Sequence, residues 1–184
     1  MNLTPTPIAG LMIAETEARG DNRGFFRRVF CAPSLKEQGI DFAAVQANMS
    51  YSAKRGTLRG LHYQTGDAPE AKVFRCIRGA IYDMTVDMRQ GSPTFLKWFG
   101  IELSSENAKA LVVPAGLAHG FLTLTDDAEV LYLTSHAYAP THEMALRFDD
   151  PRVGMQWPFA PTVISDRDRA IPDLAPDFAG VRIP

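Results

Sequence analysis

Short apolar runs separated by turn residues constrain the fold of this chain more than any other feature of its sequence. About ten such runs lie between residues 8 and 138, at a spacing typical of strands joined by tight turns. In residues 80–88 the alternation is explicit, because Tyr82 and Met84 fall on one face of an extended strand and Ile81 and Asp83 on the other. The pattern predicts a protein built mainly from antiparallel strands.

The predicted strands far outnumber the predicted helices. They cover residues 8–14, 24–30, 42–52, 57–64, 72–77, 80–88, 95–103, 110–114, 119–124 and 129–138. One short helix is expected at residues 34–37, with Ser34 as its N-cap, Glu37 completing a capping box and Gly39 as its stop signal. We therefore predict an all-β protein, a cupin-type double-stranded β-helix (jelly roll), with a few short helices mainly near the C-terminus.

Length and charge narrow the possible partners. The 184 residues fit one domain over residues 1–184, and the net charge of −2 favours neither nucleic acid nor a membrane surface as a partner. The first 21 residues lack a positively charged region, and their apolar part is too short to span a membrane. Cys31 and Cys76 match no metal or redox spacing, so we expect reduced thiols and a cytoplasmic protein.

Two histidine motifs resemble those of the cupin superfamily. Pro114, Gly116 and His119 form a Pro-x-Gly-x-x-His pattern, in which the turn would begin a strand and bring His119 into the mouth of the barrel. Gly56 is followed after five residues by His62, but Gln64 stands where cupins have a second histidine. A metal site needs more ligands than remain, so we predict no metal and no cofactor, with a metal-dependent cupin as an alternative.

The stretch LRGLHYQ places a cation and an imidazole in an apolar strand. Arg59 and His62 would lie on opposite sides of an ideal strand, but a bulge at Gly60 would bring them to the same side. An unpaired buried cation is costly. Arg59 therefore either faces solvent or binds an anion in a cavity.

Over nearly its whole length the chain resembles the dTDP-4-dehydrorhamnose 3,5-epimerases. LRGLHYQ, a later HGF and a final S-x-x-D occur in the same order as in that family. The matching stretches are residues 21–26, 46–50, 58–64, 72–75, 86–89, 92–95, 103–107, 114–121, 149–158 and 164–168, together with Tyr132 and Tyr138.

The resemblance implies a homodimeric jelly roll that exchanges N-terminal strands and needs neither metal nor cofactor. Its substrate class is a nucleotide-diphosphate sugar. The implied reaction inverts C3 and C5 of dTDP-4-dehydro-6-deoxy-D-glucose through enolate intermediates, giving dTDP-4-dehydro-L-rhamnose for dTDP-rhamnose biosynthesis. Both protons lie α to the C4 ketone, so the site needs a base, an acid on the opposite face and a cation at the enolate oxygen.

The resemblance also implies roles for individual residues. His62 is the candidate base, Asp168 would hold its other ring nitrogen, Tyr132 is the candidate acid and Lys72 would stabilise the O4 oxyanion. The candidate substrate-binding residues are Arg59, His119, Tyr138, Arg23, Phe26, Arg28, Gln46 and Asn48, with Asp83 orienting His119. Arg23 would serve the neighbouring subunit's site.

Two positions depart from the family pattern. Arg28 replaces a glutamate near the nucleotide base, and a guanidinium cannot accept the base's N–H as a carboxylate does. Glu70 replaces a glutamine two residues before Lys72, within reach of tuning it. Both departures affect binding positions and leave the catalytic set intact, so a different base or a different sugar is possible. The alternatives to the 3,5-epimerase are a mono-epimerase acting at C3 or C5 only, an epimerase of another nucleotide sugar, and a sugar-binding jelly roll without catalysis.

Overall fold

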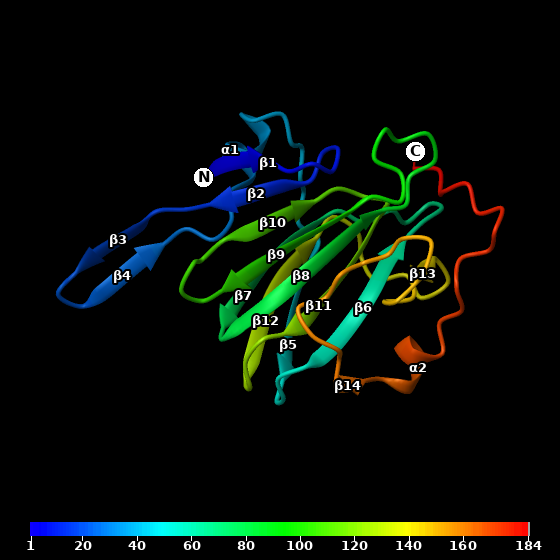
Figure 1. The fold of residues 1–184 in the computed structure, drawn as a ribbon. Helices are drawn as coiled ribbons and strands as arrows, with labels where there is room; N and C mark the ends of the chain where they lie inside the picture. The colour runs from blue at the N-terminus through cyan, green and yellow to red at the C-terminus, as the bar shows by residue number, and fades with distance from the viewer. Residues whose placement is uncertain (184) are drawn as a thin grey trace.

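A computed structural model describes residues 1–183, which form two antiparallel sheets packed face to face (Figure 1). The first sheet has the order β1 (Asn2–Pro5), β2 (Met12–Glu15), β10 (Ala110–Val113), β7 (Lys72–Arg78), β12 (Ala128–Thr134), β5 (Gln46–Ser52). The second has the order β13 (Glu143–Ala145), β6 (Thr57–Gln64), β11 (Leu117–Thr123), β8 (Ala80–Asp87), β9 (Trp98–Ser104), and β14 (Val163–Ile164) pairs in parallel with β6. The predicted all-β class is confirmed.

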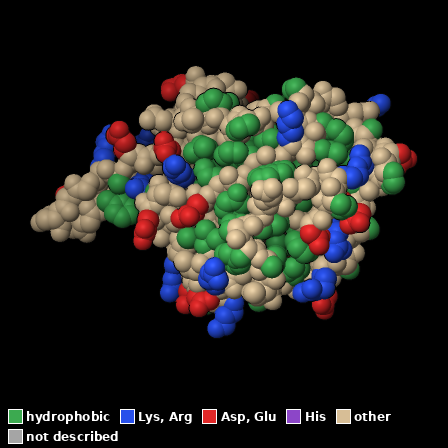
Figure 2. Space-filling model, viewed as in Figure 1, with side chains coloured by type: hydrophobic (Ala, Val, Ile, Leu, Met, Phe, Trp, Pro, Cys, Tyr) green, Lys and Arg blue, Asp and Glu red, His purple; other side chains and the backbone are tan. Residues whose placement is uncertain are grey.

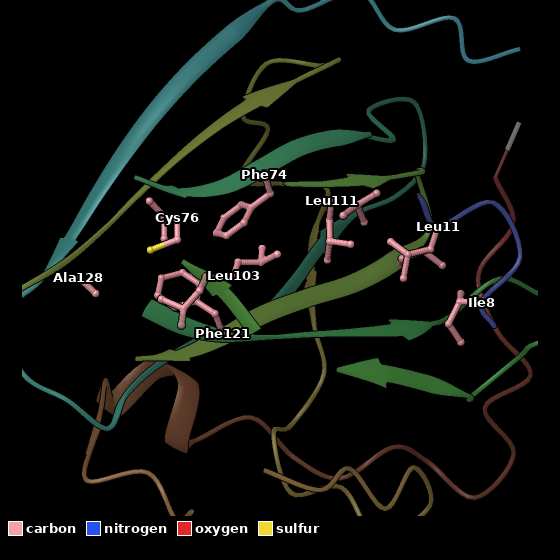
Figure 3. Packing of buried hydrophobic residues seen from close by; sticks show 12 residues of the cluster. Ile8, Leu11, Phe74, Cys76, Leu103, Leu111, Phe121 and Ala128 are labelled. Carbon is pink, nitrogen blue, oxygen red and sulfur yellow. The ribbon is translucent and has the colours of Figure 1, made fainter. Parts of the chain in front are cut away.

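The space between the sheets is filled by apolar side chains from both of them (Figure 3). Leu111 and Phe74 come from the first sheet, and Ile81, Leu103 and Phe121 come from the second. Burying a side chain of this size contributes roughly 1.5–3 kcal/mol each, so this layer supplies much of the driving force for folding.

The outer face of the second sheet is also covered. Met84 and Val86 of β8 pack under Phe148, Trp157 and other apolar residues of the C-terminal segment. Strand β8 is therefore buried on both faces, including the face of Asp83 and Thr85 that its sequence pattern alone would leave polar. The covering segment continues into the helix α2 (Asp166–Arg169), which lies against β6 (Figure 1).

Strand β6 contains the predicted bulge. His119 of β11 pairs with His62, but Phe121, two residues on, pairs with Arg59, three residues back, so β6 carries one extra residue. Residue 60 has to be glycine for this bulge to form. Its φ of +112° disfavours other residues, and an added Cβ would lie only 2.7 Å from the Cα of Gly120. The bulge turns Arg59 and His62 towards one side.

The short helix near the N-terminus starts earlier than predicted. Helix α1 spans Ala32–Lys36 with Cys31 as its N-cap, so the expectation of Ser34 as N-cap is wrong. Pro33 explains the difference, because proline suits the first helical turn, where its missing N–H costs nothing. Gly39 follows the helix at φ +83°, which confirms it as the stop.

The N-terminal region also differs from the expectation. The apolar run 8–14 is not one strand, because Ile8 and Leu11 close a turn before β2 begins. A hairpin of β3 (Ala18–Asp21) and β4 (Gly24–Arg27) projects from the sandwich (Figure 1). Its Phe25 and Phe26 are 71% and 67% exposed.

The surface carries both apolar and charged side chains. Figure 2 shows apolar side chains gathered over the middle of the face seen there, with charged side chains mostly towards its margin. Among residues 1–183, no helix has the length and apolar character needed to cross a membrane.

Candidate active site

A cavity of about 530 Å³ lies where the two sheets and the C-terminal segment meet. Its lining includes Ser50, Lys72, Phe74 and Tyr132 from the first sheet, Arg59, His62 and His119 from the second, and Ser165, Arg167 and Asp168 from the C-terminal segment. An adjoining hollow of about 270 Å³ shares His62, Lys72 and Tyr132 with it. The second hollow adds Gln46, Asn48, Glu70, Tyr138 and Glu143. Most of the predicted site residues therefore line one or both of these two neighbouring hollows.

His62 is held by a carboxylate from the far end of the chain. Its Nε2 lies 2.7 Å from Oδ1 of Asp168, and the Gly60 N–H donates to the other carboxylate oxygen at 3.4 Å. Ser165 caps the helix that carries Asp168, accepting a hydrogen bond from its backbone N–H. Burial alone would raise the pKa of Asp168, but the hydrogen bond and charge of His62, with help from Gly60 and Ser165, hold it below its ordinary value. Asp168 is thus an anion at neutral pH.

His119 has its own carboxylate partner. Its Nε2 lies 2.8 Å from Oδ2 of Asp83, and both side chains are buried. The two residues sit on neighbouring strands, because β11 pairs with β8. The predicted orientation of His119 by Asp83 agrees with this contact, and the His119 ring packs edge-on against Phe74 with 4.6 Å between ring centroids.

The first sheet supplies the opposite wall. Tyr132 of β12 pairs with Phe74 of β7, and Thr134 pairs with Lys72, so Lys72 and Tyr132 are diagonal neighbours on one face. Burial and the charge of Glu70 raise the pKa of the Tyr132 phenol, and Arg59 partly opposes them. Tyr132 is therefore neutral and able to donate a proton near neutral pH.

Within the described residues, the hydrogen bonds of the Arg59 guanidinium go to neutral acceptors. Its Nε donates to the Ser52 hydroxyl and its Nη2 to the Tyr51 carbonyl, each at 3.0 Å. No ion pair formed within residues 1–183 involves Arg59. The remaining guanidinium donors are free to meet an anionic group in the cavity.

Gln64 has a structural role. Its amide group donates to the Ala68 and Ala137 carbonyls and accepts from the Ala139 N–H, and the side chain is buried. It therefore anchors loops. In the described part of the chain, no group of three or more His, Cys, Asp or Glu side chains is placed to hold a metal ion.

Sequence reasoning missed several lining residues. Glu143 accepts a hydrogen bond from the Tyr138 hydroxyl at 2.7 Å and forms an ion pair with Arg167 at 2.5 Å, at one side of the smaller hollow. Phe74 stacks on Tyr132 with ring centroids 5.5 Å apart. Arg167 and Phe74 could have been found from their neighbours in the sequence. Arg167 directly precedes the candidate Asp168, and Phe74 lies two residues after the candidate Lys72, on the same side of a strand.

The hairpin residues are not brought into this cavity. Arg23 and Phe26 belong to the projecting β3–β4 arm or its turn, and Arg23 pairs with Asp21. Phe26 and Arg28 instead line a separate hollow with residues of the N-terminal segment. Arg23, Phe26 and Arg28 line neither the larger cavity nor the adjoining hollow of this chain.

Comparisons with known proteins agree with this architecture. The family model described as dTDP-4-dehydrorhamnose 3,5-epimerase matches residues 5–176. A relative of that name from Sinorhizobium fredii is 43% identical over 168 residues, covering 91% of this chain and 86% of the relative.

Two solved structures show the same fold. The dTDP-4-dehydrorhamnose 3,5-epimerase of Bacillus anthracis, with TDP and PPi bound, superposes with a TM-score of 0.91 at 38% identity, covering 94% of this chain and 99% of that one. A 3′-monoepimerase from Streptomyces bikiniensis, in complex with dTDP-quinovose, has a TM-score of 0.86 at 39% identity, covering 92% and 86%. The predicted jelly roll is confirmed, and the chain belongs to the dTDP-4-dehydrorhamnose 3,5-epimerase family.

Proposed function

We propose that the protein inverts C3 and C5 of dTDP-4-dehydro-6-deoxy-D-glucose, giving dTDP-4-dehydro-L-rhamnose for dTDP-rhamnose biosynthesis. The observation that carries the proposal is the arrangement of His62 and Tyr132 on opposite walls of one cavity, with Lys72 beside Tyr132. A sugar ring between the walls would meet a base on one face and an acid on the other, as inversion next to a ketone requires.

His62 begins the reaction. Because its Nε2–H is held by Asp168, the lone pair of Nδ1 is free to take a proton from the carbon next to the ketone. The electron pair of the broken C–H bond moves to O4, forming an enolate, while Asp168 stabilises the imidazolium. The Lys72 ammonium stabilises the negative charge on O4.

Tyr132 completes each inversion. Its hydroxyl gives a proton to the opposite face of the carbon, the enolate collapses to the ketone, and the phenolate recovers a proton from solvent. His62 returns its proton to solvent before the second carbon reacts. In this proposal His62, Tyr132 and Lys72 supply the base, the acid and the charge that stabilises O4, so the reaction proceeds without a metal or a cofactor.

The remaining residues bind the substrate in this proposal. Arg59, His119 and Tyr138 would contact the sugar or diphosphate, and Gln46 and Asn48 the nucleotide. We place the protein in the cytoplasm as a homodimer with exchanged N-terminal strands, in which Arg23, Phe26 and Arg28 serve the neighbouring subunit. The exposed aromatic rings of the hairpin support this assembly, because such rings are commonly covered by a partner.

The test follows the exchanged protons. The protein is incubated with dTDP-4-dehydro-6-deoxy-D-glucose in D₂O, and the sugar is read by NMR. Deuterium at both C3 and C5 is expected. No exchange with this or a related nucleotide sugar would overturn the proposal and favour a sugar-binding protein. A stoichiometric transition metal whose removal abolishes turnover would favour a metal-dependent cupin.

A mono-epimerase is the second candidate, because a 3′-monoepimerase shares the fold at 39% identity. Deuterium at only one carbon would identify it. Arg28 bears on a third possibility, a different nucleotide, which competition by TDP against other nucleoside diphosphates would reveal.

A further inference from the structure

Glu70 forms an ion pair with Lys72 inside the candidate site. The Glu70 Oε1 lies 2.9 Å from the Lys72 Nζ, and each side chain is only 11% exposed. Glu70 lies two residues before Lys72, the first residue of β7, and its ion pair with Lys72 puts both side chains on the side of the sheet that carries Tyr132. Both residues line the smaller hollow together with Tyr132.

Other charged groups around this hollow are already engaged. On β6, His62 faces Asp168 of the C-terminal segment. Glu143 of β13 faces Arg167 and the Tyr138 hydroxyl. Tyr63 is the remaining ionisable group in the lining, and Arg59 acts on Tyr132 from the larger cavity. Glu70 is therefore the carboxylate that acts on both Lys72 and Tyr132.

We propose that Glu70 is a positioning residue that holds the Lys72 ammonium beside Tyr132 and keeps the Tyr132 phenol in its proton-donating form. The catalytic consequence rests on the proposed function of Lys72 and Tyr132. A carboxylate at this place makes ionisation of the neighbouring Tyr132 phenol unfavourable, because the phenolate would be a second negative charge beside it. It also limits the positions that the flexible lysine side chain can take.

The charge of Glu70 acts in the same direction as burial. Both raise the pKa of Tyr132, whereas Arg59 lowers it. Replacing Glu70 by the isosteric but neutral glutamine removes one raising contribution, so the phenol should ionise at lower pH. A residue that merely fills space would leave this titration unchanged.

The first experiment needs no substrate. The folded protein is titrated with alkali, and the phenolate absorbance is followed. The Tyr132 contribution is the difference between a protein with Tyr132 and the same protein with Tyr132→Phe. This difference is measured in both the wild-type and the Glu70→Gln background. A midpoint at lower pH in Glu70→Gln is expected. Glu70→Asp, which keeps the charge, should restore the midpoint towards the wild-type value.

Glu129→Gln is the matched control. Glu129 lies on β12 with Tyr132 and pairs with Arg78 at 3.4 Å, but it lines neither hollow. This substitution should leave the Tyr132 midpoint unchanged. An unchanged midpoint in folded Glu70→Gln, or an equal shift in Glu129→Gln, would overturn the inference.

The second experiment measures the pH profile of kcat for epimerisation. In Glu70→Gln, the fall of kcat on the alkaline side of the profile should move to lower pH, in parallel with the titration of the Tyr132 phenol. A shifted titration with an unmoved profile would overturn the catalytic part of the inference. Absence of epimerase activity in the wild type would instead refute the proposed function, while the titration would still decide whether Glu70 controls Tyr132.

Discussion

The Nε2 atom of His62 lies 2.7 Å from the Oδ1 atom of Asp168, although the two residues are 106 positions apart in the chain. The contact exists because the C-terminal segment crosses the outer face of the second sheet and returns to β6 through β14 and α2. The segment that completes the core thus also delivers the carboxylate to the imidazole.

Asp168→Asn should lower kcat by roughly 10²–10⁴-fold, because an amide neither stabilises the imidazolium nor fixes the tautomer that leaves Nδ1 free. Turnover by NMR and TDP affinity by calorimetry would check this, with affinity expected to change little. Asp166→Asn, an exposed position in the same helix, is the control and should keep full activity. Equal losses in both variants would indicate damage to the helix.

His62→Ala should abolish hydrogen exchange at both C3 and C5 while leaving TDP binding largely intact. The imidazole is the proposed base, and alanine offers no group to accept the proton. Deuterium incorporation followed by NMR measures the effect. Retained exchange at either carbon would show that another residue removes that proton.

Tyr132→Phe should slow product formation by roughly 10²–10⁴-fold while sparing proton removal, because only the donor on the opposite face is lost. The measurement compares loss of label from substrate deuterated at C3 and C5 with formation of the inverted sugar. If loss of label falls as steeply as product formation, Tyr132 is not the proton donor.

The local part of this architecture could be predicted from the sequence. Strand β6 has the bounds expected from its pattern, and the bulge followed from a glycine between a cation and an imidazole. The β3–β4 hairpin could not be predicted as it stands, because β3 is exposed and lacks an apolar face. Glu143 was missed because its partner Arg167 lies 24 residues away on another element, and only the tertiary fold joins them.

Gly60→Ala should destabilise the protein by at least about 1–3 kcal/mol, since the new Cβ would lie 2.7 Å from the Gly120 Cα at a φ of +112°. Relief of this clash would also move His62, so activity should fall as well. Denaturant unfolding measures the loss. Gly91→Ala is the matched control, because Gly91 has a φ of +75° but nothing within 4 Å of an added Cβ. It should therefore show the backbone cost alone, and an equal loss in both variants would contradict a packing role for Gly60.

Tyr63 should make the protein less stable in alkali. The side chain is 2% exposed, and burial raises its pKa from 10.0 to about 12. Below pH 10 the Tyr63 phenol is neutral in both the folded protein and the unfolded chain, and its contribution to the free energy of unfolding is fully present. As pH rises towards 12 the unfolded chain ionises first, so about 2–3 kcal/mol of stability is lost. Tyr63→Phe removes this ionisation, and the difference between the two proteins' free energies of unfolding should change by that amount across this pH range. A difference that stays constant with pH would show that Tyr63 ionises as easily in the folded protein as in the unfolded chain.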